Sequence, residues 1–204
     1  AQTTQLLVEP PWRPAVLWDQ VTLTCQGLGT AGATTWYKDG QRLRQEGLNH
    51  FTVTETGTYQ CERPGSGFSP TVSVSNDWLV LQVPARPLLE GDTVTLRCRG
   101  WWNRLVTQVR FYHGNEEEVA WDPVLEFGDV DVGHSGTYQC VATNQLGQDG
   151  HRVFWALSPE LALEVTPGSP WVTAVAVNVG RTLLFLVLLL AVIGGCHCWH
   201  RQGG

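Results

Sequence analysis

The chain has 204 residues and a formal net charge of −6 at pH 7, with 43% hydrophobic and 16% charged residues. This length allows one or two domains, and the acidic balance argues against a surface that binds nucleic acid. The six cysteines are an even number spread along the sequence, as in disulfide-bonded extracellular domains. Because methionine is absent, we expect a mature cell-surface or secreted chain whose signal peptide has been removed.

Two stretches of the sequence repeat one pattern of residues. The first comprises Val21–Cys25, Trp36–Gly40 and Thr56–Cys61, and the second comprises Val94–Cys98, Phe111–Gly114 and Ser135–Cys140. Apolar and polar residues alternate before the first cysteine of each copy, as in a strand with one buried face. A cysteine, an aromatic residue and then Tyr-x-Cys is the signature of the immunoglobulin fold, in which the cysteines bridge two sheets and the tyrosine forms a corner.

The repeated pattern predicts an all-β chain with two tandem immunoglobulin-like sandwiches, residues 1–79 and 80–166. The expected disulfides are Cys25–Cys61 and Cys98–Cys140, which hold the fold and do no chemistry. In the chain-entropy model each contributes about 4 kcal/mol. Phe111 stands where the first copy has Trp36, so we expect the second core to be less fully packed at that point.

Four segments around the expected junction of the two domains carry a family resemblance. They are Pro10–Trp12, Asp77–Gln82, Glu90–Gly91 and Leu96–Trp101. Together they resemble the leukocyte Fc receptors and Fc receptor-like proteins. In that family two tryptophans at the junction clamp a proline of the antibody Fc, and by position the resemblance implies Trp78 and Trp101 for this role. Such tryptophan pairs are typical binding hot spots; the alternative is that they only pack the contact between the domains.

The resemblance implies further Fc contacts from the turn Tyr112–Glu118 and the loop Asn144–Asp149. The expected ligand-binding residues are therefore Trp78, Trp101, Tyr112, His113, Asn144 and Gln145. An IgG-like Fc is the first partner that the resemblance implies. The acidic run Glu116–Glu118 departs from the lysine-rich turn of several family members, which leaves another antibody class, or a ligand that is not an antibody, open.

A mostly apolar stretch, residues 172–196, is expected to form a single transmembrane helix after a stalk of residues 167–171. Residues 182–195 alone would span about 21 Å, less than a hydrocarbon core of about 30 Å, so Arg181 falls inside the bilayer. A guanidinium there costs about 2.5–3.5 kcal/mol on insertion scales unless a partner compensates or the side chain snorkels to the head groups. Arg201 after the stretch favours a type I plasma-membrane topology, with residues 197–204 in the cytosol.

All four tyrosines precede this stretch, so no tyrosine-based signalling motif follows it. Asn178 and Arg181 share one helix face at the spacing i, i+3 and resemble the Asn-x-x-Arg element of adaptor-coupled leukocyte receptors. The resemblance implies that Arg181 pairs with an intramembrane aspartate of an ITAM-bearing adaptor such as the Fc receptor common gamma chain. An orphan adhesion or recognition protein, or a lipid-anchored decoy, would need no such adaptor.

Cys196 and Cys198 lie at the expected inner edge of the membrane stretch. Reversible palmitoylation is the expected modification. Metal binding by these cysteines with His197 and His200 is disfavoured, because no second pair of ligands or folded frame accompanies them. Elsewhere the sequence shows no Ser/His/Asp ordering, phosphate loop or metal-site spacing, so we expect neither an enzyme nor a cofactor or metal site.

Overall fold

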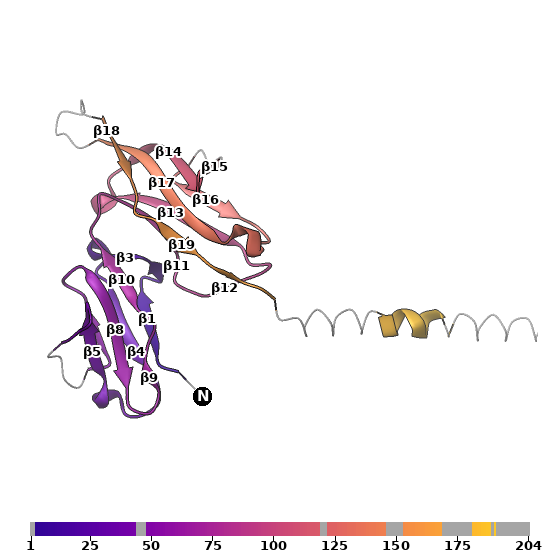
Figure 1. The fold of residues 1–204 in the computed structure, drawn as a ribbon, viewed down its shortest axis with the longest axis horizontal. Coiled ribbons are helices and arrows are strands. Elements are labelled where there is room, and N and C mark those ends of the chain that lie inside the picture. Colours follow the sequence, from indigo (N-terminus) through magenta and orange to yellow (C-terminus); the bar gives the residue numbers. More distant parts are fainter. Residues whose placement is uncertain are drawn as a thin grey trace, which may run out of the picture. The chain divides into compact units, whose positions relative to one another are not determined.

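The computed structural model describes residues 3–43, 48–118, 122–145, 153–168, 181–188 and 190. The chain divides into two compact units, residues 1–166 and 167–204. The described part of the first unit is built from strands and short 3₁₀ turns (Figure 1). Its strands form two sandwiches, each with its own buried cluster of apolar side chains.

The first sandwich packs two sheets against each other. One sheet has the order β1 (Gln5–Glu9), β4 (Thr22–Gln26) and β7 (His50–Thr52); the other has the order β3 (Ala15–Val16), β10 (Val72–Ser75), β8 (Gly57–Arg63), β5 (Thr35–Lys38) and β6 (Gln41–Arg42), with β9 (Gly67–Phe68) paired to β8. The connections include the 3₁₀ turns η1 (Leu17–Asp19) and η2 (Ala31–Ala33). The alternation expected before Cys25 is confirmed, since Leu23 and Cys25 of β4 are buried and their neighbours are not.

Trp36 occupies the centre of the first core and is fully buried. Its ring meets the edge of Phe51 with 4.7 Å between the centroids. Cys25 and Cys61 form the predicted disulfide, with Cα atoms 6.1 Å apart. The hydroxyl of Tyr59 donates to the backbone oxygen of Glu55 at 2.8 Å, the corner hydrogen bond that the Tyr-x-Cys pattern predicts.

The second sandwich repeats this plan. One sheet has the order β16 (Val124–Phe127), β13 (Val94–Gly100), β11 (Leu79–Pro84) and β2 (Trp12–Arg13); the other has the order β15 (Glu116–Glu118), β14 (Val106–His113), β17 (Gly136–Gln145) and β18 (Val153–Leu157), with β19 (Leu161–Leu163) paired to β17. A parallel pair, β12 (Leu88–Leu89) and β20 (Val165–Thr166), and the 3₁₀ turns η3 (Trp101–Asn103) and η4 (Val132–His134) complete it.

The second core has the same corner and the same bridge between sheets. Cys98 and Cys140 are bonded, with Cα atoms 6.1 Å apart. Phe111 is fully buried, as Trp36 is in the first core. The hydroxyl of Tyr138 donates to the backbone oxygen of His134 at 2.9 Å. Both predicted disulfides are therefore confirmed, and the first unit has the all-β, immunoglobulin-like fold that the repeated pattern predicts.

A short strand from the N-terminal segment ties the two sandwiches together. β2 pairs with β11 in an antiparallel ladder that sets Arg13 opposite Val83. β2, which lies between β1 and β3 of the first sandwich, is thus hydrogen-bonded to a strand of the second, and β11 itself starts at Leu79. The domain boundary between residues 79 and 80 stays a prediction.

The second unit contains the expected membrane stretch. Of residues 172–196 the structure describes 181–188 and 190, all of them helical, with Arg181 exposed. Within the described residues no helix is long and apolar enough to cross a membrane. Asn178, Cys196 and Cys198 lie outside the described residues. The transmembrane helix, the stalk and the cytosolic tail stay predictions.

Candidate binding site at the junction of the two sandwiches

The two tryptophans that the resemblance singles out are neighbours in space. In the antiparallel ladder of β11 and β13, Leu79 lies opposite Gly100, so the next pair beyond the strand ends is Trp78 and Trp101. The backbone N–H of Trp101 donates to the carbonyl oxygen of Trp78 at 2.9 Å. The two rings are 4.8 Å apart between centroids and tilted by 52°.

Strand alternation explains which way these side chains face. Successive residues of a strand point to opposite faces of the sheet. The buried residues of one face belong to the core of the second sandwich: Leu79, Leu81 and Val83 of β11 and Val94, Leu96 and Cys98 of β13. The opposite face of this sheet is the face toward the first sandwich. It therefore carries Trp78 and Gln82 from one chain segment and Arg97, Arg99 and Trp101 from the other.

The tryptophan pair presents a partly exposed aromatic surface. Trp78 is 53% exposed, and Trp102, whose ring meets that of Trp101 edge-on at 6.1 Å, is 62% exposed. Trp101 is held from two sides: its indole N–H donates to the Oδ1 of Asn76 at 3.0 Å, and the guanidinium of Arg104 lies 5.5 Å from its ring centroid. Large rings fixed in this way lose little conformational entropy when a ligand covers them, which is why tryptophans are frequent hot spots.

The turn that carries Trp101 has an uncommon backbone conformation. Trp102 and Asn103 are both left-handed, with φ of 53° and 58°. Asparagine tolerates this region, but a bulky residue adopts it at a cost of about 1–3 kcal/mol and only where the surroundings enforce it. In this conformation the side chain of Trp102 points outward beside Trp101, so the turn presents Trp102 to solvent.

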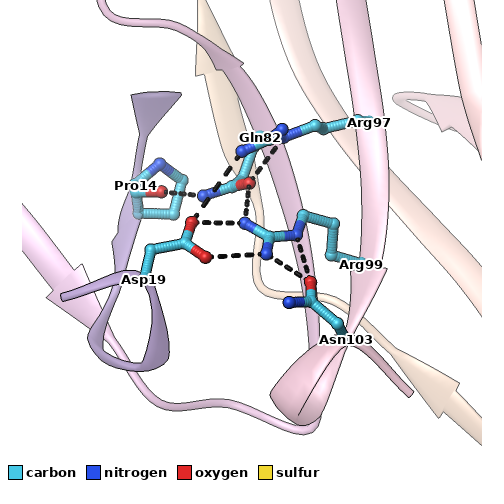
Figure 2. A network of polar contacts seen from close by, with 6 residues as sticks. All are labelled: Pro14, Asp19, Gln82, Arg97, Arg99 and Asn103. Carbon is cyan, nitrogen blue, oxygen red and sulfur yellow. Dashed lines mark hydrogen bonds and ion pairs between the residues drawn. The ribbon is translucent and has the colours of Figure 1, made fainter. Parts of the chain in front are cut away.

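A polar network crosses the junction of the two sandwiches (Figure 2). Asp19 of η1 in the first sandwich receives two hydrogen bonds from Arg99 of β13, at 2.5 and 2.8 Å. The side chains of Asp19 and Arg99 are only 16% and 14% exposed. Arg99 also donates through Nε to the Oδ1 of Asn103 at 3.1 Å, which connects the ion pair to the tryptophan turn.

Gln82 organises the same network from β11. It is fully buried, and its Oε1 accepts hydrogen bonds from Arg97 at 2.8 Å and from Arg99 at 3.1 Å. Its Nε2 donates to the carbonyl oxygen of Pro14 in the first sandwich at 2.7 Å. Every polar atom of this buried amide therefore has a partner, as burial requires.

Arg97 is the more weakly paired of the two arginines. Its guanidinium lies 3.7 Å above the ring centroid of Trp12 and 3.9 Å from the nearest oxygen of Asp19. The pKa of Arg97 is lowered to about 10, mainly by burial and also by the neighbouring charge of Arg99, while Asp19 acts in the opposite direction. One carboxylate thus faces two guanidinium groups.

Tyr112 and His113 lie at the other end of β14 from the tryptophan turn. In the ladder with β17, Val106 is opposite Asn144 and His113 is opposite Tyr138. Tyr112 is six positions after Val106, which is about 20 Å along a strand. His113 stacks on Tyr138 with 4.3 Å between centroids, a contact within the fold. The side chains of Asn144 and Gln145 lie outside the described part, so this half of the expected ligand set stays a prediction.

Sequence reasoning missed the residues of the polar network: Asp19, Gln82, Arg97, Arg99 and Asn103. The sequence does contain one indication of this network. Arg97 and Arg99 alternate with Leu96 and Cys98, which indicates a strand with one strongly charged face. Gln82 interrupts the apolar run of β11 on the face that matches it. The partner Asp19 had no such signal.

Comparisons with known proteins agree with this architecture. A family model described as "Immunoglobulin domain" matches residues 78–153. The low affinity immunoglobulin gamma Fc region receptor II of Mus musculus is 35% identical over 156 residues, which cover 71% of this chain and 46% of that protein. Fc receptor-like B of Homo sapiens is 32% identical, over 74% of this chain and 38% of that protein. The low affinity immunoglobulin gamma Fc region receptor III of Rattus norvegicus is 31% identical, over 70% of this chain and 57% of that protein.

The chain therefore spans about half of the length of these relatives. The repeated fold, the two bridges and the matched family model define a protein of the immunoglobulin superfamily. The chain belongs to the family of Fc receptors and Fc receptor-like proteins.

Proposed function

We propose that the chain is a cell-surface immune receptor that binds the Fc region of an immunoglobulin through Trp78 and Trp101. The observation that carries this proposal is the preformed pair itself, with rings 4.8 Å apart and Trp78 half exposed. Two relatives are named as receptors for the immunoglobulin gamma Fc region, which makes an IgG-like Fc the first ligand to test.

The chemistry of the pair suits a compact apolar group on the ligand. With 4.8 Å between their centroids the two indole rings already contact each other, so an aliphatic ring or side chain of the ligand would pack on their exposed faces and edges rather than between them. Because Asn76 and the main chain already hold Trp101, binding orders few additional groups. Truncation of either hot-spot ring is expected to cost about 2 kcal/mol or more.

The acidic run Glu116–Glu118 does not face this pair. It pairs with the far end of β14, where Glu116 is opposite His113, and Glu117 lies 3.8 Å from Arg110. The negative charge of this run therefore lies on a separate part of the surface. If the ligand extends that far, the run is the place where antibody classes would be distinguished.

The test displays the full chain on cells and measures the binding of labelled immunoglobulins of every class. We expect one class to bind, and Trp78→Ala and Trp101→Ala each to weaken that binding at least about 30-fold, the equivalent of a 2 kcal/mol hot spot. Phe68→Ala is the matched control, since Phe68 is an equally exposed aromatic residue on β9 of the first sandwich. If no class binds, or if both tryptophan variants bind as the wild type does, the proposal is wrong.

We further propose that residues 172–196 span the plasma membrane once, after two domains and the stalk, and that Arg181 pairs with an acidic residue of an ITAM-bearing adaptor such as the Fc receptor common gamma chain. The support is the apolar run that follows Arg181, the helical conformation of residues 181–188 and the strong preference of a guanidinium in hydrocarbon for a carboxylate. Palmitoylation of Cys196 and Cys198 belongs to the same proposal.

Co-precipitation from cells that express both chains tests the pairing. Arg181→Leu should abolish association with the adaptor, whereas Arg201→Leu, outside the span, should leave it intact. Association that survives Arg181→Leu would leave snorkelling as the role of Arg181. Release of the receptor by a phospholipase that cleaves lipid anchors would instead support the decoy alternative.

A further inference from the structure

We propose that Asp19 and Arg99 are positioning residues that hold the tryptophan turn in its binding geometry by bracing it against the first sandwich. The role rests on the proposed binding at Trp78 and Trp101, because its purpose is to keep those rings in place. The proposed effect of Asp19 and Arg99 on the tryptophan pair is indirect. They act through Asn103, which lies in the same 3₁₀ turn as Trp101.

A single guanidinium makes both connections. The two terminal nitrogens of Arg99 donate to the carboxylate of Asp19, at 2.5 and 2.8 Å. The Nε and one terminal nitrogen reach the Oδ1 of Asn103. Because a guanidinium is planar and rigid, its orientation toward Asp19 also sets its orientation toward Asn103 (Figure 2). The position of the first sandwich therefore determines the position of the turn that carries Trp101.

The turn needs such support. Trp102 and Asn103 are both left-handed, a conformation that persists only where surrounding contacts over-determine it. The described contacts of the Asn103 side chain are the hydrogen bonds from Arg99. Without them, the backbone of Trp102 would be free to leave the left-handed region, and Trp101 directly before it would move as well.

The ion pair of Asp19 with Arg99 and its link to Asn103 are called the brace below. Because the ion pair is shielded from water, the brace is strong and sensitive to charge. The Asp19 and Arg99 side chains are largely buried, so their attraction is screened less than that of a surface pair. Asp19 also faces Arg97 at 3.9 Å. Neutralising Asp19 would leave two neighbouring guanidinium groups without their shared counter-charge, and their repulsion would push β13 and its turn away from η1.

Strand geometry places the brace and the tryptophans on one face. Arg99 and Trp101 are two residues apart along β13 and its extension, and Gln82 and Trp78 are four residues apart along β11 and its extension. Residues at even spacing share a face. The ion pair, the buried amide and the aromatic pair therefore form one layer, and a displacement of Arg99 would reach Trp101 two residues further along the same chain segment.

The test needs a readout of ring geometry that requires no ligand. Tilted indoles 4.8 Å apart couple electronically and give an exciton couplet in the far-ultraviolet circular dichroism spectrum. The full chain is measured in lipid nanodiscs, and the couplet of the pair is assigned as the signal that both Trp78→Phe and Trp101→Phe remove. Thermal unfolding of the same samples reports stability separately.

We expect Asp19→Asn to remove most of this couplet and to weaken immunoglobulin binding about tenfold, the scale of coupling between linked sites. Asp19→Glu, which restores the charge, should recover both. The matched control is Arg86→Gln, which breaks the ion pair of Arg86 with Asp92 elsewhere in the second sandwich and should change neither. A couplet that is intact in folded Asp19→Asn overturns the proposal.

A second variant covers the case in which Asp19→Asn does not fold. Asn103→Gly removes the acceptor of the turn but suits the left-handed backbone, so the chain should remain folded while the couplet weakens. If Asn103→Gly keeps the wild-type couplet, the brace has no positioning role. If no immunoglobulin binds the wild-type chain and the couplet still depends on Asp19, the proposed ligand is wrong and the positioning role stands.

Discussion

The indole N–H of Trp101 donates a hydrogen bond to the side-chain oxygen of Asn76 at 3.0 Å. Asn76 precedes β11, and Trp101 follows β13, so this bond joins the entry of one strand to the exit of its neighbour. It fixes the rotation of the Trp101 ring relative to Trp78, and it is separate from the brace that holds the turn from the opposite side.

Removal of this bond should therefore loosen the ring without unfolding the chain. For Asn76→Ala we expect immunoglobulin binding to weaken about fivefold, corresponding to a hydrogen bond of about 1 kcal/mol, with the unfolding temperature almost unchanged because the bond is exposed. Asn76→Asp keeps an acceptor at the same position and should bind nearly as the wild type does. Equal losses in the alanine and aspartate variants would show that the acceptor is not what matters.

The two arginines of the junction should respond differently to replacement. Arg99→Met leaves the buried carboxylate of Asp19 without its two-pronged partner, and loss of one partner of a buried pair costs about 3–5 kcal/mol. Arg97→Met should change the free energy of unfolding by less than about 1.5 kcal/mol, because Asp19 and the Oε1 of Gln82 both keep their hydrogen bonds from Arg99 and a methionine fills most of the same volume. The lowered pKa of Arg97, about 10, marks its desolvation.

Chemical denaturation of both variants, followed by tryptophan fluorescence, gives the two free energies of unfolding. The stacking of Arg97 on Trp12 at 3.7 Å is preserved in part by the methionine side chain, since sulfur and methylene groups also pack well on aromatic rings. Equal destabilisation by the two substitutions would mean that Asp19 depends on both arginines equally.

The two tryptophans of the site are implied by the family resemblance of the sequence, whereas the brace has no counterpart in the sequence analysis. The resemblance places Trp78 and Trp101 at the domain junction, and the register of β11 against β13 explains why their rings are in contact. The corner bonds of Tyr59 and Tyr138 follow from the sequence pattern itself, because the Tyr-x-Cys spacing defines them.

Asp19 and Arg99 are 80 residues apart, and neither belongs to a periodic pattern that involves the other. Their contact depends on the angle at which the two sandwiches meet and on a short 3₁₀ turn, η1, that sequence periodicity does not reveal. For His113 the family resemblance implies a ligand contact, which stays a prediction. The structure adds a contact that the sequence pattern does not reveal, the stack of the His113 ring on Tyr138.

A glycine beside that stack provides a test of the second core. Gly136 has φ of +148°, and a Cβ at this position would lie 2.4 Å from the Nε2 of His113. Gly136→Ala should therefore both strain the backbone and displace His113 from Tyr138, and we expect a loss of at least about 2 kcal/mol of unfolding free energy. Denaturation curves measured alongside Gly128→Ala provide the comparison.

Gly128 is the matched control because a Cβ there meets nothing within 4 Å. Its replacement should leave stability unchanged or raise it slightly, since alanine restricts the unfolded chain. If Gly136→Ala is as stable as Gly128→Ala, the stack of His113 on Tyr138 is free to rearrange and contributes little to the fold.

Acid sensitivity should come in part from Asp92 near the start of the second sandwich. The Arg86 guanidinium, 2.5 Å away, lowers the pKa of Asp92, and the backbone N–H of Leu89 lowers it further. A carboxyl whose folded pKa is depressed contributes stability that is fully present above its unfolded pKa of about 3.9. That contribution is lost as the pH falls through the lower, folded pKa.

Asp92→Asn should therefore be less stable than the wild type at pH 6, and the difference should shrink as the pH falls below about 3.9. Free energies of unfolding measured for both chains from pH 6 to strongly acidic solution give this difference directly. Arg86→Gln should show a smaller effect of the same sign, because the hydrogen bond from Leu89 to Asp92 remains in place. A difference that stays constant through the acidic range would mean that the contribution of Asp92 to folding does not depend on its negative charge.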